Sequence, residues 1–371
     1  MTERLATLLQ EQVDGLAVPP VPSAAVLAAG KRQRARRSWA VAVSSAAVAA
    51  AAVVAVVALR PDGGRTAPDP APAPAPASYV AFGAGSTIYV GATQATVPDT
   101  VHSLHYTSVG VLVRSNPAEG SSDGSGPEAL TLVHEDGSTV DLGSIPQGVG
   151  PATDPTQPYY VLAEAAGSGF EAAVRDAETG AEVARVPLPD RAPSSWDVPP
   201  LSLSGDTLYV GYRASTMAVD WRTGQAQEAL GLGGGLPEVH GGLVERVTED
   251  TLAIVDASSG APVLTVPMVT PGATISLSPN GRFALVADHT GTGRRATAVV
   301  TVHPTAGGAS VTLTGQEEES WGWSVDDRPF RVEADALVVC DPVTGGCTPS
   351  ATRVPSQASQ DVRLGGRVYE S

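Results

Sequence analysis

Only two cysteines occur in this chain of 371 residues, Cys340 and Cys347, and they flank the turn-like sequence DPVTGG. A disulfide, two free thiols or part of a metal site are all chemically open to such a pair. No histidine or third cysteine lies close enough in sequence to complete a tetrahedral set of ligands, which disfavours a metal site. In an oxidising compartment a pair around one turn typically forms a disulfide. We predict a structural disulfide, with free thiols as the alternative.

The histidines offer little further chemistry. Six occur in the chain, and only two lie close together in sequence: His102 and His105, in VHSLHY. Residues three apart in a β-strand point to opposite faces, so we predict no shared metal ion. The sequence contains no zinc-protease or phosphate-loop motif. Neither a catalytic residue nor a cofactor is predicted, although an enzyme site assembled from distant residues stays possible.

One segment is apolar enough to cross a membrane. Trp39 to Leu59 is a run of 21 residues without a charge, and a helix of that length spans a bilayer core of about 30 Å. The basic sequence KRQRARR precedes it, and only Arg60 and Arg65 follow closely. The positive-inside bias therefore places the N-terminus in the cytoplasm. We predict a single-pass anchor in the plasma membrane; a cleaved export signal and a buried core helix are the alternatives.

The segments on either side of this predicted anchor differ in character. Residues 1–38 begin with a short amphipathic pattern that ends at Gly15 and the following prolines, so this tail is either disordered or folds on a cytoplasmic regulator. Residues 60–78 alternate proline with alanine, which favours an extended polyproline II linker. The remaining residues, 79–371, are predicted to form one extracytoplasmic domain.

Charge is distributed unevenly along the chain. The formal net charge is −16, yet the first 38 residues carry six basic and three acidic side chains. The remainder therefore holds 17 basic and 36 acidic residues. Because binding to a phosphate backbone depends on lysine and arginine, nucleic acid is excluded as a partner of the main domain.

A turn-like pattern recurs in the main domain. Its clear copies are DAETG at Asp176, DWRTG at Asp220, DASSG at Asp256 and DPVTG at Asp341, with looser relatives EDGST at Glu135 and HPTAGG at His303. β-Branched runs surround these copies, and the spacing of about 40 residues is typical of a propeller blade of four strands. Aspartate can bond to the backbone two residues on, and glycine supplies the positive φ that a hairpin requires.

A second pattern precedes these turns. LSLSGDTLYVGY, at residues 201–212, and ISLSPNGRFALVAD, at residues 275–288, each read as a hairpin of two alternating strands. At these residues the sequence resembles the bacterial extracytoplasmic WD-repeat-like β-propellers, although the Trp-Asp blade ending is absent. The resemblance covers about residues 79–371 and implies an all-β propeller; it does not identify an activity.

The number of blades follows from the two ends of the domain. Six turn copies mark six blades, and STIYVGATQATVP and DVRLGGRVYES each leave about one hairpin over. A propeller closes when its N- and C-terminal strands share a blade, because closure removes exposed sheet edges. We predict seven blades, with six as the alternative, and a closing blade made of these two hairpins.

A candidate ligand face lies where the last strand of one blade connects to the innermost strand of the next. Two such connections carry tryptophan beside acidic residues, a combination that can stack on a sugar or hold a cation. The candidate residues are Trp196, Asp197, Glu317, Glu318, Glu319 and Trp321, with Trp323 as a further member. The alternative is that the tryptophans pack between blades and the acidic side chains are hydrated.

Two functions from different classes remain at this stage. The first is a membrane-anchored, extracytoplasmic binding or sensing module for a protein or a small ligand. The second is an anchored propeller hydrolase, lactonase or lyase with a site at the central channel. The sequence favours the first function, since neither a zinc-protease nor a phosphate-loop motif is present. It does not identify the ligand.

Overall fold

A computed structural model describes residues 78–116, 127–146, 148–193, 198–235, 237–268, 270, 273–290, 297–313, 321–333, 336–352 and 362–367. Contacts divide the chain into two units, residues 1–71 and 72–371, of which the second holds all these residues. The predicted tail, anchor and nearly all of the linker lie outside the described residues. Within the described part, no helix has the length and apolar character needed to cross a membrane.

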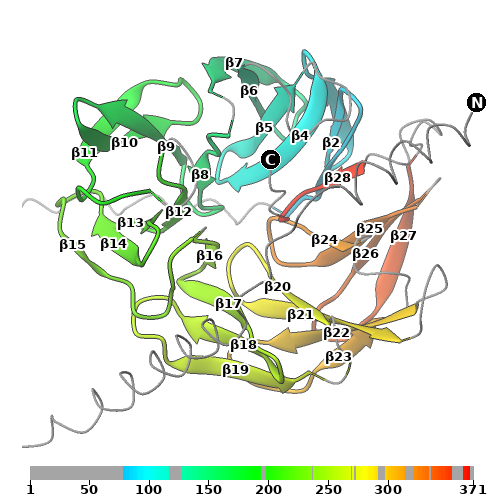
Figure 1. The fold of residues 1–371 in the computed structure, drawn as a ribbon. Helices are drawn as coiled ribbons and strands as arrows, with labels where there is room; N and C mark the ends of the chain where they lie inside the picture. The colour runs from blue at the N-terminus through cyan, green and yellow to red at the C-terminus, as the bar shows by residue number, and fades with distance from the viewer. Residues whose placement is uncertain are drawn as a thin grey trace, which may run out of the picture. The chain divides into compact units, whose positions relative to one another are not determined.

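The described part is all β, as predicted, and its strands form seven antiparallel sheets of four (Figure 1). The first blade combines β28 (Val362–Leu364), β1 (Ala81–Ala84), β2 (Thr87–Val90) and β3 (Thr93–Thr96). The second contains β4 (Thr100–Thr107), β5 (Gly110–Asn116), β6 (Glu128–Val133) and β7 (Thr139–Ile145). The third contains β8 (Ala152–Thr153), β9 (Tyr159–Ala166), β10 (Gly169–Asp176) and β11 (Glu182–Pro187).

The other four blades follow the chain in order. The fourth contains β12 (Leu201–Ser204), β13 (Thr207–Gly211), β14 (Thr216–Asp220) and β15 (Ala226–Glu228). The fifth contains β16 (Val239–His240), β17 (Leu243–Val247), β18 (Thr251–Asp256) and β19 (Pro262–Pro267). The sixth contains β20 (Thr274–Leu277), β21 (Phe283–Thr290), β22 (Thr297–Pro304) and β23 (Val311–Leu313). The seventh contains β24 (Trp321–Trp323), β25 (Pro329–Val332), β26 (Ala336–Cys340) and β27 (Cys347–Ala351).

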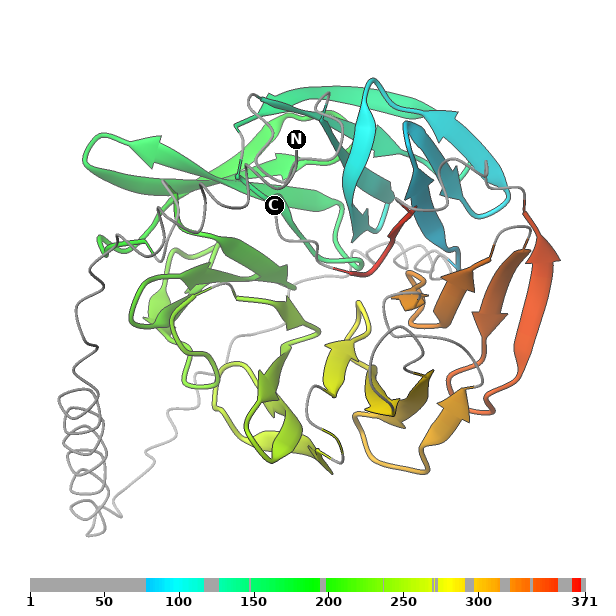
Figure 2. The same cartoon turned by 45° about the vertical axis from the view of Figure 1, so that its right-hand side comes forward.

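The blades form a ring, which Figures 1 and 2 show from two directions. The first strands of neighbouring blades contact one another around the centre; examples are β28 with β4, β8 with β12, and β24 with β28. The fourth strands are the most exposed, and β15 and β27 are exposed along their whole length. The apolar core therefore lies between the faces of adjacent blades, and the seven-bladed prediction is confirmed.

The four clear turn copies adopt one conformation between the third and fourth strands of their blades. In each copy the aspartate Oδ1 accepts a hydrogen bond from the backbone N–H three residues on, at 2.7 to 2.9 Å. The glycine four residues on donates its N–H to the aspartate carbonyl and has a φ of 69 to 74°. A side chain is strained at such a φ, so glycine is required there. The repeat was thus correctly interpreted as a hairpin signal.

The disulfide prediction is also confirmed. Cys340 is the last residue of β26 and Cys347 is the first residue of β27, and the two are opposite each other in the register of the hairpin. Their sulfur atoms are bonded, with 4.0 Å between the Cα atoms. The bond therefore links the third strand of the seventh blade to its exposed fourth strand.

The closing blade differs from the prediction of two equal hairpins. The N-terminal part of the domain supplies three strands, and the C-terminal part supplies only β28 (Figure 1). Leu364 of β28 pairs with Phe82 of β1. The physical reason is that Gly365 and Gly366 follow β28 and turn against the seventh blade, with Gly366 at a φ of 69°. A Cβ added to Gly366 would lie 2.6 Å from the Cβ of Trp323. Glycine therefore ends the strand after three residues.

A buried tyrosine fixes this closure. The Tyr106 hydroxyl, on β4, donates a hydrogen bond to the carbonyl oxygen of Trp323 at 2.8 Å and accepts one from the backbone N–H of Ala81 at 3.1 Å. These contacts join the second, seventh and first blades. Burial raises the pKa of Tyr106 well above its ordinary value, so the hydroxyl keeps the proton that it donates.

Removal of β28 is expected to open the ring. In a chain of residues 1–361, β1 has an unpaired edge. We expect its melting midpoint to lie at least 10 °C below that of the full chain and its unfolding to lose the single cooperative transition. The control is a chain that ends at Arg367, which keeps β28 and the glycine turn. Differential scanning calorimetry measures both; equal melting midpoints for the two truncations would contradict the role of β28.

Candidate functional site

The predicted ligand face is only partly within the described residues. Trp321 opens β24 and is 2% exposed, packed with Leu285 and Trp323 between the sixth and seventh blades. Trp323 is equally buried, and its Nε1 lies 3.2 Å from the hydroxyl of Ser276. The indole of Trp321 is therefore a core group and does not present a surface for stacking. Trp196, Asp197, Glu317, Glu318 and Glu319 lie outside the described residues, and their part in a ligand face stays a prediction.

Strand alternation explains the orientation of Trp321. Trp321 and Trp323 share the face of β24 that packs in the core with Leu285 of the sixth blade, while Gly322 faces the first blade. A Cβ added to Gly322 would lie 2.8 Å from both Phe330 and Leu364. The sequence WGW thus reflects a large gap on one side of the strand and a close approach on the other.

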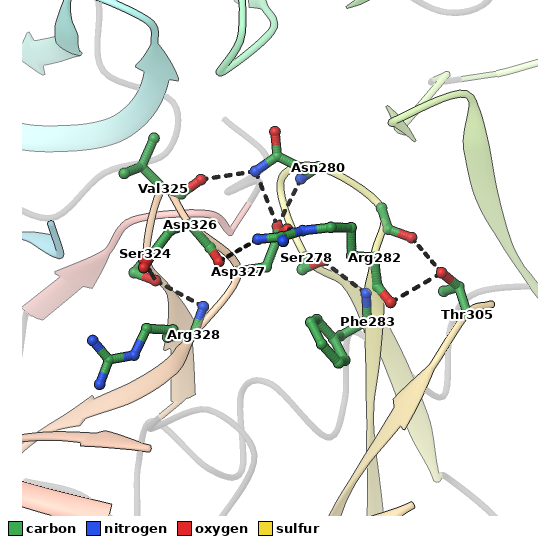
Figure 3. Close-up of polar contacts among 11 residues, drawn as sticks. Ser278, Asn280, Arg282, Phe283, Thr305, Ser324, Val325, Asp326, Asp327 and Arg328 are labelled. Carbon is green, nitrogen blue, oxygen red and sulfur yellow. Dashed lines mark hydrogen bonds and ion pairs between the residues drawn. The ribbon is translucent and has the colours of Figure 1, made fainter. Parts of the chain in front are cut away.

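A polar cluster joins the first turns of the sixth and seventh blades (Figure 3). The carboxylate of Asp327 is fully buried and accepts hydrogen bonds from the backbone N–H of Asn280 at 2.8 Å and from Nε of Arg282 at 2.5 Å. Asn280 Nδ2 also donates to the carbonyl of Val325, and Arg282 Nη2 donates to that of Asp326. Asp327 has a φ of 65°, a region in which aspartate is enriched. Because its donors and acceptors satisfy one another, this cluster serves to attach two blades.

A second charged cluster is buried in the second blade. Arg114 on β5 and Glu128 on β6 are 4% and 1% exposed, and their side chains form an ion pair with an Nε to Oε2 distance of 2.7 Å. His102 on β4 places its Nδ1 3.2 Å from Oε1 of Glu128. Three neighbouring strands thus contribute to one group of charges.

The prediction that His102 and His105 face opposite sides is wrong. A β-bulge interrupts the register of β4 between Val101 and Ser103, so His102 is an extra residue and alternation is lost there. His102 contacts Glu128, and His105 lies close enough to Arg114 and Glu128 for their charges to act on it. Both rings therefore lie near the same ion pair.

The environment fixes the protonation of this cluster. Burial lowers the pKa of His105 to about 3, and the nearby Arg114 guanidinium adds to the effect, so this ring is neutral near pH 7. Burial alone would raise the pKa of the Glu128 carboxyl, but the His102 hydrogen bond and the Arg114 charge together hold it below its ordinary value. Glu128 is therefore an ionised partner of Arg114.

A cavity of about 450 Å³ lies between the second and third blades, beside this cluster. Glu128 is opposite the cavity residue Ile145 in the register of β6 and β7, and Arg114 is opposite the cavity residue Leu130 in that of β5 and β6. The apolar lining consists mainly of Leu130, Leu142, Ile145, Val149, Leu162 and Val198. Volumes of this size and apolar linings are typical of small-molecule sites.

Charged side chains of the third blade reach the same cavity. Glu164 of β9 and Arg175 of β10 both line it and form an ion pair, with 2.9 Å between Oε1 and Nη2. Arg185 of β11 binds the other oxygen of Glu164 at 2.8 Å and also contacts Glu171 and Glu182. Burial alone would raise the pKa of Glu164, but hydrogen bonds from Arg185 and Arg175 outweigh burial and lower it. Both oxygens of Glu164 are thus already engaged.

Tyr160 completes the polar part of the cavity wall. Tyr160 is 1% exposed, and burial raises the pKa of its hydroxyl in spite of the opposing charge of Arg175 and a hydrogen bond with the Arg175 side chain. It therefore stays a neutral phenol. Nε of Arg175 is buried and has no hydrogen-bond partner among the described residues. The cavity consequently combines an apolar wall with one unsatisfied donor.

These groups are suited to binding more than to acid–base chemistry. A general acid or base works best with a pKa near the operating pH, whereas the carboxylates of Glu128 and Glu164 are shifted down and the His105 ring is shifted far below neutrality. Nowhere in the described ranges do three or more His, Cys, Asp or Glu side chains gather so that they could hold a metal ion.

Sequence reasoning missed both the buried ion pair and the cavity. A usable signal was the charge inside apolar strands: Arg114 follows GVLV, Glu128 precedes ALTLV, and Arg175 follows AAV. A charged residue at such a position is rarely buried unless it is paired. Nothing in the local sequence identified the cavity, since its apolar residues come from two different blades and from the connections that follow them.

Substitution of Glu128 by glutamine is expected to destabilise the protein. It leaves the buried Arg114 guanidinium without its counter-charge, which costs about 3 kcal/mol of unfolding free energy. Glu178, which is exposed, provides the matched control, and Glu178→Gln should leave stability unchanged. Chemical denaturation of the full chain measures both variants.

The pH dependence follows from the lowered pKa of Glu128. The pKa of Glu128 in the folded protein lies below the unfolded value of about 4.3. The stabilising effect of the Glu128 carboxylate is therefore complete above about pH 4.3 and is lost as the pH falls through the folded-state pKa. The difference between wild type and Glu128→Gln should therefore be largest above about pH 4.3 and should narrow in more acidic solution. A constant difference would contradict the assigned ion pair.

Comparison with known proteins does not assign this chain to a family. No family model matches the chain, and no curated protein matches it. Among solved structures, apo AztD from Citrobacter koseri is 12% identical with a TM-score of 0.49, covering 79% of this chain and all of that one. A putative 6-phosphogluconolactonase from Bacteroides fragilis is 13% identical with a TM-score of 0.43, covering 77% of this chain and 98% of that one. TolB from Acinetobacter baumannii is 14% identical with a TM-score of 0.35, covering 78% and 65%. These likenesses carry no inference about activity.

Proposed function

We propose that this protein is a membrane-anchored binding or sensing module whose extracytoplasmic propeller takes up a small ligand between its second and third blades. The observation that carries the proposal is the cavity of about 450 Å³ with an apolar wall and a few fixed polar groups. Cavities with this combination are the usual sites of ligand binding. The ion pairs of Glu164 with Arg175 and Arg185 hold the polar rim in place.

Binding is favoured over catalysis by the state of the charged groups. Hydrogen bonds and charges of neighbouring side chains hold the pKa of each resolved carboxyl below its ordinary value: His102 and Arg114 act on Glu128, and Arg185 and Arg175 act on Glu164. Such groups order a site but do not exchange protons near neutral pH. A hydrolase, lactonase or lyase at this cavity would need a group poised to do so.

The proposed location rests on the sequence and on the disulfide. The uncharged run Trp39 to Leu59 with basic residues before it supports an anchor with its N-terminus in the cytoplasm. The Cys340–Cys347 bond supports an oxidising space around the propeller. In this arrangement residues 1–38 are available to a cytoplasmic regulator.

Filling the cavity should abolish ligand retention. Leu142 is half-buried on the outermost strand of the second blade and lines the cavity, so Leu142→Trp places a large ring inside it without disturbing the central ring of strands. Val183→Trp, on the outermost strand of the third blade and 49% exposed, is the matched control.

The measurement is mass spectrometry of small molecules released by denaturing the purified full-length protein. Wild type and Val183→Trp are expected to retain a compound at a ratio near one per chain, and Leu142→Trp should retain less than a tenth of it. Equal retention by all three proteins, or no retained compound, would count against the proposed site.

The membrane location has its own test. Full-length protein is expected to sediment with membranes and resist alkaline carbonate, whereas a chain without residues 39–59 is released. Protease added outside intact spheroplasts should digest the propeller, and alkylation after denaturation should find no free thiol unless a reductant is added. Free Cys340 and Cys347 thiols, or full protection from the external protease, would contradict an extracytoplasmic propeller.

A further inference from the structure

We infer that the ligand of the cavity between the second and third blades is an uncharged, mainly apolar molecule with one hydrogen-bond acceptor, such as a carbonyl oxygen, that binds Nε of Arg175. This inference rests on the proposed function and names the chemical class of its ligand. It follows from the volume and lining of the cavity, from the charges on its rim and from one buried donor.

The apolar character follows from the wall. Six of the fourteen lining residues are leucine, isoleucine or valine, and the small residues Ala163, Ala165 and Gly148 keep the space open. Burying an apolar body there is favourable by about 25 cal/mol for each Å² removed from water. A volume of about 450 Å³ accepts a molecule of one or two rings or a short acyl chain.

The acceptor follows from Arg175. Its side chain forms hydrogen bonds with Glu164, through Nη2, and with Tyr160, but its Nε is buried without a partner among the described residues. A buried donor left unsatisfied is unfavourable by about 1 to 3 kcal/mol. An acceptor oxygen on a ligand would remove that penalty, which makes Arg175 the group that orients the ligand.

The absence of charge follows from the pairing of the charged groups. Glu164 and Arg175 are the charged residues of the lining, they have opposite charges, and they form an ion pair. Arg185 joins Glu164 to Glu171 and Glu182 beyond the lining, and these five residues together carry a formal charge of −1. An anion would compete with Glu164 for Arg175 and would lie near this net negative charge. A cation would compete for Glu164, whose two oxygens already accept from Arg175 and Arg185. A neutral molecule disturbs neither contact.

Three naphthalene probes of similar shape separate these requirements. 6-Propionyl-2-(dimethylamino)naphthalene is neutral and carries a carbonyl acceptor. The parent amine, 2-(dimethylamino)-6-propylnaphthalene, keeps the three-carbon chain and lacks the acceptor, and 6-(dimethylamino)naphthalene-2-carboxylate is anionic. Each is titrated by equilibrium dialysis against full-length wild type, Arg175→Met and Leu142→Trp in the same detergent. The Leu142→Trp protein measures how much probe binds to the detergent micelles and to the protein surface instead of the cavity.

In wild type the ketone is expected to bind about tenfold more tightly than the parent amine, as a hydrogen bond from a charged donor implies, and the carboxylate should bind more weakly than the ketone. Methionine keeps the apolar stem of Arg175 but has no donor, so Arg175→Met should bind the ketone and the parent amine equally. Neither should bind Leu142→Trp above background.

Other outcomes overturn distinct statements. Tighter binding of the carboxylate than of the ketone, or a ketone preference that survives in Arg175→Met, would show that the ligand class is wrong while the site stands. If no probe binds to wild type, the inferred ligand class is also wrong. The mass spectrometry of retained compounds would then decide whether the cavity is a binding site. Binding of all three probes to Leu142→Trp as strongly as to wild type would overturn the proposed site itself.

Discussion

The pairing of β28 with β1 is the contact on which the other six blades depend. A β-sheet that ends in an open edge exposes unsatisfied backbone groups, and a ring of blades avoids this at its centre only when the last blade meets the first. Leu364 pairs with Phe82 for this reason, and Tyr106 bonds to the backbone of both the first and the seventh blade. The other blades repeat the same four-stranded antiparallel arrangement within this closed ring.

The contrast between one long-range closing contact and many local hairpins explains which features could be predicted from the sequence. The hairpins that begin at Asp176, Asp220, Asp256 and Asp341 are encoded within five residues, because an aspartate side chain and a glycine φ determine the turn. The fold, the seven blades and the disulfide were predicted because each depends on such local signals and on their spacing. The 3+1 division of the closing blade was not, since it depends on contacts of Gly366 with a strand of another blade.

The candidate site was less accessible to sequence reasoning for the same physical cause. Whether a tryptophan is displayed or buried depends on which face of its strand meets a neighbour, and the Gly322 contact decides this for Trp321. A bulge at His102 reverses an alternation that residue counting assumes.

The cavity arises from the fit of two whole blades, with Leu130 and Leu162 on opposite walls of its lining, and no single motif describes it. The Glu164–Arg175 pair lines this cavity, and the buried Arg114–Glu128 pair lies beside it.

The separation of Phe82 from Leu364 along the chain also affects how the protein is made. During synthesis β1, β2 and β3 emerge first, and β1 then keeps an unpaired edge until the ribosome has produced almost all of the remaining blades. Contacts between such distant residues form slowly, and waiting edges are prone to pair with other chains. The nascent propeller is therefore expected to depend on chaperones for most of its translation, and its yield should respond to translation rate more than its thermodynamic stability would suggest.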